Sequence, residues 1–237
     1  MSNLQKRILT SIVVFPLSIF FIIMGGNYIV SFLYAVLILA NFEVFSVFKR
    51  KLSIILLDGI LLLSLLSILH LRNDTASSFI LLIWVIILTI SSDIGGYVFG
   101  KIFKWKKITK ISPNKTLSGV IGSFIFSLGS VFLLGFIMKL ISGLETDFFY
   151  KSRYFILAIF FSFAAQLGDL FISYFKRLEK IKDTGKLLPG HGGIFDRIDS
   201  LMFVVILANI LYYFKLFPWL KEKLLFLDQL VLSEFLL

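Results

Sequence analysis

Residues 79–99 read FILLIWVIILTISSDIGGYVF, an apolar run of 21 residues that contains a single charged side chain. An α-helix needs about 20 consecutive apolar residues to cross a hydrocarbon core of about 30 Å. The run therefore predicts a membrane-spanning helix. Its one carboxylate, Asp93, lies near the end of the run and is followed by small residues that permit close helix packing.

Similar runs recur along the whole sequence, which is 58% hydrophobic and 16% charged. A soluble domain of this length would need more charge to cover its surface. We therefore predict an all-α polytopic membrane protein, a single membrane domain over residues 1–237 built as a bundle of about seven transmembrane helices. The predicted spans are 8–24, 28–48, 53–70, 79–99, 117–141, 154–175 and 201–217. The tail at 224–237 is too short for a standard span and predicts an interfacial or docked helix.

The formal net charge of +10 would suggest nucleic-acid binding in a soluble protein. In a membrane protein, Lys and Arg collect in cytoplasmic loops. A cytoplasmic N-terminus places 17 of the 24 basic residues on the cytoplasmic side, together with both long polar loops, 101–116 and 176–199. We therefore expect a polar cavity that faces the cytoplasm, and no nucleic-acid partner.

Three carboxylates surround the second polar loop. Asp169 lies inside an apolar run, where a carboxylate normally faces the bundle interior or a wet cavity. Asp196 and Asp199 share one face of a helix start, and such oxygen ligands suit Mg²⁺. A structural reading is open as well: Asp196 or Asp199 would cap the last span. In that reading Asp169 would pair with Lys176 or Arg177.

The same loop contains glycines and basic residues that favour phosphate binding. Gly190, Gly192 and Gly193 surround His191, and glycines let the backbone approach a ligand and form an anion-binding nest. His191 is expected to carry a proton or to donate a hydrogen bond to phosphate, although a lone loop histidine is more often incidental. The basic residues expected to contact phosphate are Lys176, Arg177, Lys182, Lys186 and Arg197.

The first polar loop ends in Ser112-Pro-Asn-Lys115-Thr116, directly before the span at 117–141. Thr116 or Ser118 is expected to present helix N-terminal amides to a phosphate. The glycine spacing is not that of a Walker A loop. Lys115 is the candidate for a triphosphate contact, whereas the lysines between 101 and 110 favour anchoring at the membrane surface.

Four motifs between Ser173 and Asp199 carry a resemblance to a known family: Ser-x-Phe-Lys-Arg, Lys-Asp-x-Gly, Pro-x-His-Gly-Gly and Asp-Arg-Ile-Asp. Together they resemble the signature of the phosphatidate cytidylyltransferase (CDP-diacylglycerol synthase) family, within residues 166–200. The stretches 93–100 and 112–119 are also similar to the family, as is the opening 6–16. The resemblance implies that CTP and phosphatidic acid react to CDP-diacylglycerol and pyrophosphate, with Mg²⁺ or another hard divalent cation.

The resemblance also implies roles for individual residues. It places Asp169, Asp196 and Asp199 around the metal. The expected catalytic residues are Asp169, Asp196, Asp199, Lys176, Arg177 and His191. The expected substrate contacts are Lys115, Ser112, Asp93, Lys182, Asp183, Lys186, Gly192, Gly193 and Arg197.

The expected location is the bacterial inner membrane, with the N-terminus and the active site cytoplasmic, and a homodimer is left open. A CTP-dependent lipid or polyprenol kinase is the alternative enzyme, with CDP as its soluble product. In a cation-coupled transporter, Asp169 and Asp93 would bind a cation or a proton. That third class predicts paired broken helices and repeats, and it does not explain the polar stretch 189–199.

Overall fold

The computed structural model describes residues 3–109, 111–113, 115–142, 152–185, 187–188 and 192–215. Within these residues the chain forms seven α-helices, joined by turns and two isolated β-bridges. The helices are α1 (Asn3–Met24), α2 (Gly26–Val47), α3 (Lys51–Asn73), α4 (Ala76–Phe103), α5 (Leu117–Ser142), α6 (Ser152–Leu178) and α7 (Phe195–Tyr213). The predicted all-α class is confirmed for the described residues, whereas the tail at 224–237 lies outside them.

Five of these helices, α2 to α6, are long and apolar enough to cross a membrane by length and composition. This supports a multi-pass membrane protein. The apolar part of α1 is shorter, Ile12–Met24. Helix α7 carries Asp196, Arg197 and Asp199 in its first two turns. The count of seven spans therefore stays a prediction for α1 and α7.

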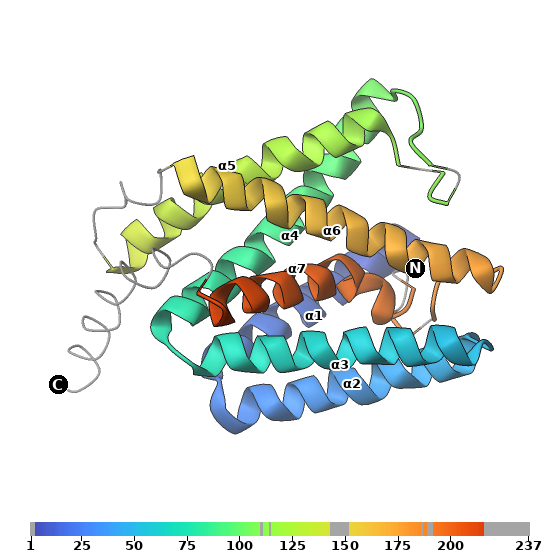
Figure 1. Ribbon diagram of the computed structural model, residues 1–237, viewed down its shortest axis with the longest axis horizontal. Coiled ribbons are helices and arrows are strands. Elements are labelled where there is room, and N and C mark those ends of the chain that lie inside the picture. Colours follow the sequence, from blue (N-terminus) through green and yellow to red (C-terminus); the bar gives the residue numbers. More distant parts are fainter. Residues whose placement is uncertain are drawn as a thin grey trace.

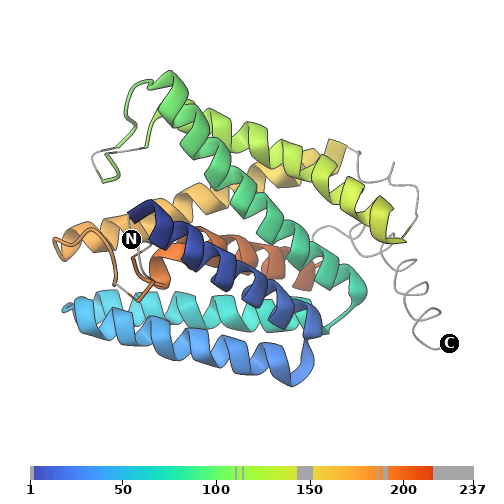
Figure 2. The same cartoon turned by 180° about the vertical axis from the view of Figure 1, so that it is seen from behind.

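The helices form a bundle around α7. Helices α2 and α3 make an antiparallel hairpin, and α7 packs between this hairpin and α6 (Figure 1). Helix α4 crosses behind α6 and α7 and continues into α5, which returns alongside α6. Seen from behind, α1 and α4 are the nearest helices (Figure 2). Among the described residues no strand positions the site, so the packing of the helices and their connections brings its residues together.

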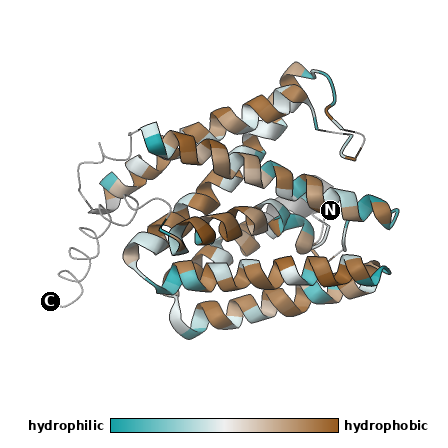
Figure 3. Cartoon of the chain, in the orientation of Figure 1, coloured by the Kyte–Doolittle hydropathy of each residue, from teal (hydrophilic) through white to brown (hydrophobic). Residues whose placement is uncertain are grey.

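Two clusters of buried apolar side chains hold the bundle together. One lies among α3 to α7 and includes Trp84, whose ring meets those of Tyr154 and Phe161 edge-on. The other lies among α2, α3, α6 and α7 and includes Leu57 and Phe195. The outer helix surfaces are also hydrophobic, and hydrophilic residues concentrate toward the helix ends and in the connections (Figure 3). Such a surface suits hydrocarbon as the surrounding solvent.

Helices α4 and α5 pack closely because small residues face each other. A methyl group on Gly95 would lie 2.3 Å from the Gly122 carbonyl oxygen, and one on Gly122 would lie 2.4 Å from the Gly95 carbonyl oxygen. Neither position has room for a side chain. The small residues after Asp93 therefore do what the sequence predicted: they permit a close helix approach.

The connections between α4 and α5 and between α6 and α7, residues 104–116 and 179–194, lie at one end of the bundle (Figure 1). We call this the basic end, and the end that holds the turns before α2 and α4 the opposite end. Helix α7 begins at Phe195, earlier than the predicted Leu201. Asp196 and Asp199 thus lie in the first turns of a helix, as expected, and the predicted span began later because hydropathy excludes charged residues from a span.

Candidate active site

Asp169 and Lys115 form an ion pair that joins α6 to the connection between α4 and α5 at the basic end. Lys115 Nζ lies 3.0 Å from Asp169 Oδ2 and donates a second hydrogen bond, also 3.0 Å long, to the Gln166 carbonyl oxygen. Ser173 Oγ lies 3.5 Å from the other carboxylate oxygen of Asp169. The partner of Asp169 is thus Lys115, and neither Lys176 nor Arg177. More than a third of the Asp169 side chain remains accessible (36%).

Asp93 and Asp199 lie near this pair. Asp93 comes from α4, Asp169 from α6 and Asp199 from α7, and the three carboxylates are close enough for their charges to interact. Asp93 is exposed and Asp199 is half-buried, with Asp199 Oδ1 accepting a hydrogen bond of 2.8 Å from the Ser200 amide. Like charges brought together in this way repel one another. Lys115, together with Arg197, supplies positive charge to the same region.

Asp196 has a different environment from the other two predicted metal ligands. Its Oδ1 pairs with Lys176 Nζ at 2.8 Å, and both side chains are buried. Its Oδ2 accepts hydrogen bonds from the amides of Thr184, at 2.7 Å, and Gly193, at 3.2 Å. Among the described residues, no three His, Cys, Asp or Glu side chains are arranged to hold a metal ion. The predicted set of three aspartates is therefore not gathered into one cluster, and Asp196 organises the loop.

Two other predicted contacts fasten the connections to the bundle. Arg177 donates from Nε to the Ile111 carbonyl oxygen, at 3.2 Å, and from Nη1 to that of Ile181, at 2.8 Å. Thr116 Oγ1 accepts a hydrogen bond of 3.1 Å from the Gly119 amide and so caps α5 itself. This amide, expected to face a phosphate, already has an acceptor within the chain.

The remaining predicted residues fall into three groups. Ser112 makes the turn before Lys115, because its carbonyl oxygen accepts the Lys115 amide at 3.0 Å. Gly192 has a φ of +88°, which favours glycine, and its carbonyl oxygen accepts the Leu188 amide at 2.9 Å. The exposed charged residues are Lys182, Asp183 and Arg197. Lys186 and His191 lie outside the described residues.

One residue that contacts the connection between α6 and α7, Glu43, was not predicted from the sequence. Glu43 on α2 is only 2% exposed, and its carboxylate accepts hydrogen bonds from the amides of Ile194 and Phe195. A signal was present: Glu43 is the one acidic residue in the apolar run 28–48, and a carboxylate inside such a run is seldom incidental.

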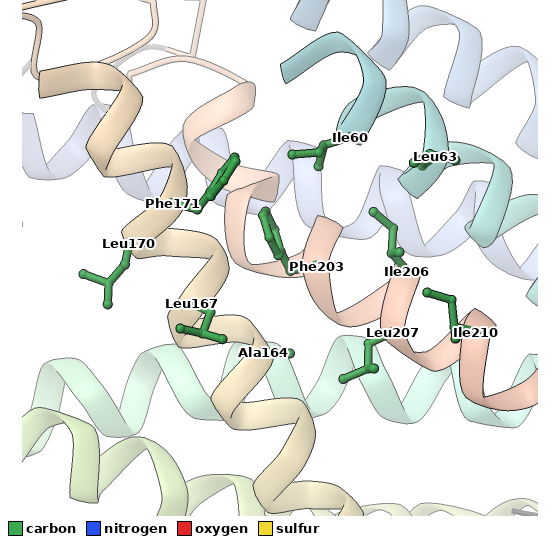
Figure 4. A pocket seen from close by; sticks show the side chains of 10 residues that line it. All are labelled: Ile60, Leu63, Ala164, Leu167, Leu170, Phe171, Phe203, Ile206, Leu207 and Ile210. Atoms are coloured by element: carbon green, nitrogen blue, oxygen red, sulfur yellow. The ribbon is translucent and has the colours of Figure 1, made fainter. Parts of the chain in front are cut away.

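An apolar groove of about 710 Å³ lies between α3, α6 and α7 (Figure 4). Its walls include Leu63 from α3, Leu167 from α6 and Phe203 from α7, and none of the predicted site residues lines it. Phe203 approaches the site, because a methyl group on Gly168 would lie 2.8 Å from its ring and 3.0 Å from the Asp199 carbonyl oxygen. The groove thus begins within one helical turn of Asp199.

Comparison with known proteins places this geometry in a family. The model of the cytidylyltransferase family matches residues 50–215. A phosphatidate cytidylyltransferase of Helicobacter pylori is 38% identical over 152 residues, which cover 62% of this chain and 52% of that protein. One of Staphylococcus saprophyticus is 45% identical over 122 residues, covering 51% of this chain and 44% of that protein. One of Staphylococcus aureus is 43% identical over 136 residues, with coverages of 55% and 46%.

The chain spans about half the length of these curated relatives. The matched residues nevertheless include both polar connections, the Lys115–Asp169 pair, the Lys176–Asp196 pair and the carboxylates of Asp93 and Asp199. The match covers more than half of the chain. This chain therefore belongs to the cytidylyltransferase family.

Proposed function

We propose that the chain transfers the cytidylyl group of CTP to phosphatidic acid. A phosphate oxygen of phosphatidic acid attacks the α-phosphorus of CTP, and the bond from that phosphorus to the β-phosphate oxygen breaks. Pyrophosphate leaves and CDP-diacylglycerol is formed. The observation that carries the proposal is the family match over residues 50–215, which includes the paired lysines and aspartates of the basic end.

The charged residues of the basic end suit a reaction between two polyanions. Phosphoryl-type transfers depend mainly on positioning and charge neutralisation. Lys115 and Arg197 supply positive charge beside the carboxylates, and Lys182 is exposed in the neighbouring loop. The attacking phosphate is already ionised near neutral pH, so the reaction needs no strong general base. The chain's main tasks are then to hold both substrates in line and to neutralise their negative charges.

The proposal includes a divalent cation, Mg²⁺ or another hard ion. Mg²⁺ is usually bound through one or two protein carboxylates plus substrate phosphates, so a group of three protein ligands is not required. Asp169 and Asp199 are the accessible members of the predicted set, with Asp93 beside them. Asp196 is assigned to the loop, because Lys176 and two amides occupy its oxygens. When bound, such an ion would neutralise charge on the phosphate oxygens.

The lipid substrate is assigned to the groove. We place one acyl chain of phosphatidic acid along Phe203 and Leu207 of α7, with its phosphate at Asp199, because a lipid needs an apolar path that ends at the polar site. The finer topology belongs to the same proposal. Seven spans with a cytoplasmic N-terminus in a bacterial inner membrane would open the basic end to cytosolic CTP, through a polar cavity that faces the cytoplasm.

The decisive experiment uses purified protein in mixed micelles with phosphatidic acid, Mg²⁺ and CTP labelled at the α-phosphate. Cytidylyl transfer moves the label into the lipid fraction and releases pyrophosphate in equal amount. A lipid kinase would leave the label in soluble CDP while the lipid gains an unlabelled phosphate. Absence of any metal-dependent turnover would contradict both enzymes and favour the transporter.

A further inference from the structure

Glu43 connects a helix outside the family match to the centre of the signature. It lies on α2, whereas the match begins at residue 50. Its Oε1 accepts the Ile194 amide at 3.0 Å and its Oε2 accepts the Phe195 amide at 3.1 Å. Thr184 Oγ1 lies 3.5 Å from the same Oε2. One buried carboxylate thus contacts the connection between α6 and α7 at Thr184 and again at its end, at Ile194.

The partners of Glu43 are backbone amides instead of a basic side chain. The three ion pairs formed by the described residues involve Glu179, Asp169 and Asp196 as acids. The amides of Ile194 and Phe195 belong to the first turn of α7, where unpaired N–H groups and the helix dipole favour a negative charge. This arrangement stabilises the buried charge only while the loop and α7 keep their present position.

Two loop glycines confirm how tightly the chain surrounds this carboxylate. A methyl group on Gly185 would lie 2.4 Å from Glu43 Oε1, and one on Gly193 would lie 2.4 Å from Glu43 Oε2. A side chain at either position would have to displace the Glu43 carboxylate. Gly193 was expected to offer its backbone to a phosphate, but here its amide donates to Asp196 and its α-carbon faces Glu43. These glycines allow the loop to close around a protein carboxylate.

The contact also sets the position of a proposed catalytic residue. Asp199 follows Phe195 by four residues, so it lies about one turn further along the same face of α7. A shift of the Phe195 amide moves Asp199 with it. Asp196 holds the loop from its other side through the amides of Thr184 and Gly193. The loop is therefore held between two carboxylates, one from α2 and one from α7.

We propose that Glu43 is a positioning residue. It holds the connection between α6 and α7, which we call the signature loop, and the first turn of α7 in the geometry needed for cytidylyl transfer. This inference rests on the proposed function. Glu43 acts through the backbone and touches no substrate. It would make α2 part of the catalytic machinery even though α2 lies outside the matched residues.

The first test replaces Glu43 by Gln, by Asp and by Ala, with Glu179→Gln as the matched control. Glu179 also has a buried side chain at the basic end, at the start of the connection between α6 and α7, but its carboxylate contacts Arg50 instead of Thr184, Ile194 or Phe195. For Glu43→Gln we expect kcat/KM for CTP to fall about tenfold to a hundredfold, because one charge-assisted hydrogen bond is lost and an amide N–H faces another N–H. Glu43→Asp should retain more activity than Glu43→Ala, and Glu179→Gln should match the wild type.

Hydrogen exchange separates positioning from general stability and does not depend on turnover. In Glu43→Gln, the amides of Ile194 and Phe195 should exchange faster, while exchange in α3 and α4 and the melting temperature in detergent stay near wild type. Unchanged exchange at these two amides would overturn the inference. A wild type without cytidylyl transfer would contradict the proposed function, and the exchange result would still decide whether Glu43 holds the loop.

A double substitution provides the second test and covers a Glu43→Gln variant that fails to fold. Gly185→Ala should lower activity strongly, because its methyl group needs the space that the Glu43 side chain fills. Shortening that side chain in Glu43→Asp removes the obstacle. The double variant should therefore be more active than Gly185→Ala alone. Strictly additive losses would contradict a direct contact between the loop and Glu43.

Discussion

The two ends of the helix bundle both gather polar side chains, but they use them differently. At the opposite end, Tyr212 Oη contacts an Asp74 carboxylate oxygen and lies 2.9 Å from Thr75 Oγ1. His70 Nδ1 lies 2.7 Å from Asn209 Oδ1. Each of these polar groups finds its partner on another helix or turn. They join α7 to the turn between α3 and α4.

At the basic end, Asp93, Asp169 and Asp199 come from three helices and lie within range of one another's charge, and of these three Asp169 forms an ion pair, with Lys115. Asp93 is exposed, and Asp199 is half-buried and accepts a hydrogen bond from the Ser200 amide. Polar groups that complete one another stabilise a fold, whereas accessible like charges cost stability until a ligand neutralises them. The comparison indicates that polar groups complete one another at the opposite end, whereas like charges lie close together at the basic end, where the proposed function places the substrates.

One ion pair at the basic end, between Lys176 and Asp196, should stabilise the fold in the way that the polar groups of the opposite end do. Lys176 and Asp196 are both buried and paired, so Lys176→Met leaves a buried carboxylate without its cation. We expect a loss of about 3–5 kcal/mol in the free energy of unfolding, measured by denaturation in detergent. Lys115→Met is the matched control: its partner Asp169 is more accessible, so the loss should be about 0–1 kcal/mol. Equal losses in the two variants would contradict the distinction between buried and accessible pairs.

Asp199→Asn tests whether a carboxylate of the basic end serves activity and not stability. The change removes a charge from the accessible cluster and keeps the shape of the side chain. We expect label transfer from CTP to lipid to fall by at least about 100-fold, because the proposed cation would lose a carboxylate ligand. The free energy of unfolding should hold or rise, since repulsion with Asp169 and Asp93 is relieved. A normal transfer rate would remove Asp199 from the proposed metal site.

The groove runs along α7 from Phe203 toward Ile210, between the two ends. Leu207→Trp would fill part of it. If an acyl chain loses contact with about two CH₂ groups, each worth about 0.8 kcal/mol, KM for long-chain phosphatidic acid rises about tenfold. KM for CTP should stay constant, and a short-chain phosphatidic acid should show a smaller change. An equal rise for both lipids would place the acyl chain elsewhere.

The smallest effect is expected at the opposite end. Tyr212→Phe removes the hydroxyl that contacts Asp74 and Thr75. The free energy of unfolding should fall by about 1–2 kcal/mol, as for a buried hydrogen bond to a charged group. Cytidylyl transfer at a temperature well below unfolding should be unchanged. A large loss of activity in a folded Tyr212→Phe variant would show that the two ends are coupled.

Much of this architecture follows from the sequence. The apolar runs predicted each helix, because their lengths match the thickness of a hydrocarbon core, and the helices differ mainly at their polar ends. The motifs between Ser173 and Asp199 predicted the family that the comparison confirms. The sequence did not distinguish Asp196 from Asp199, since both stand in the same short motif. Their roles separate only because one faces Lys176 and the loop amides, and the other faces Asp169.

The sequence by itself determined that this is a helical membrane protein of the cytidylyltransferase family, because run length and motif spacing are local properties of the chain. Only the tertiary structure decided that Lys115 pairs with Asp169 and that Glu43 holds the signature loop. A helix that is apolar on all sides carries no periodic signal of which face meets which neighbour. Partners far apart in the sequence are therefore selected by helix packing.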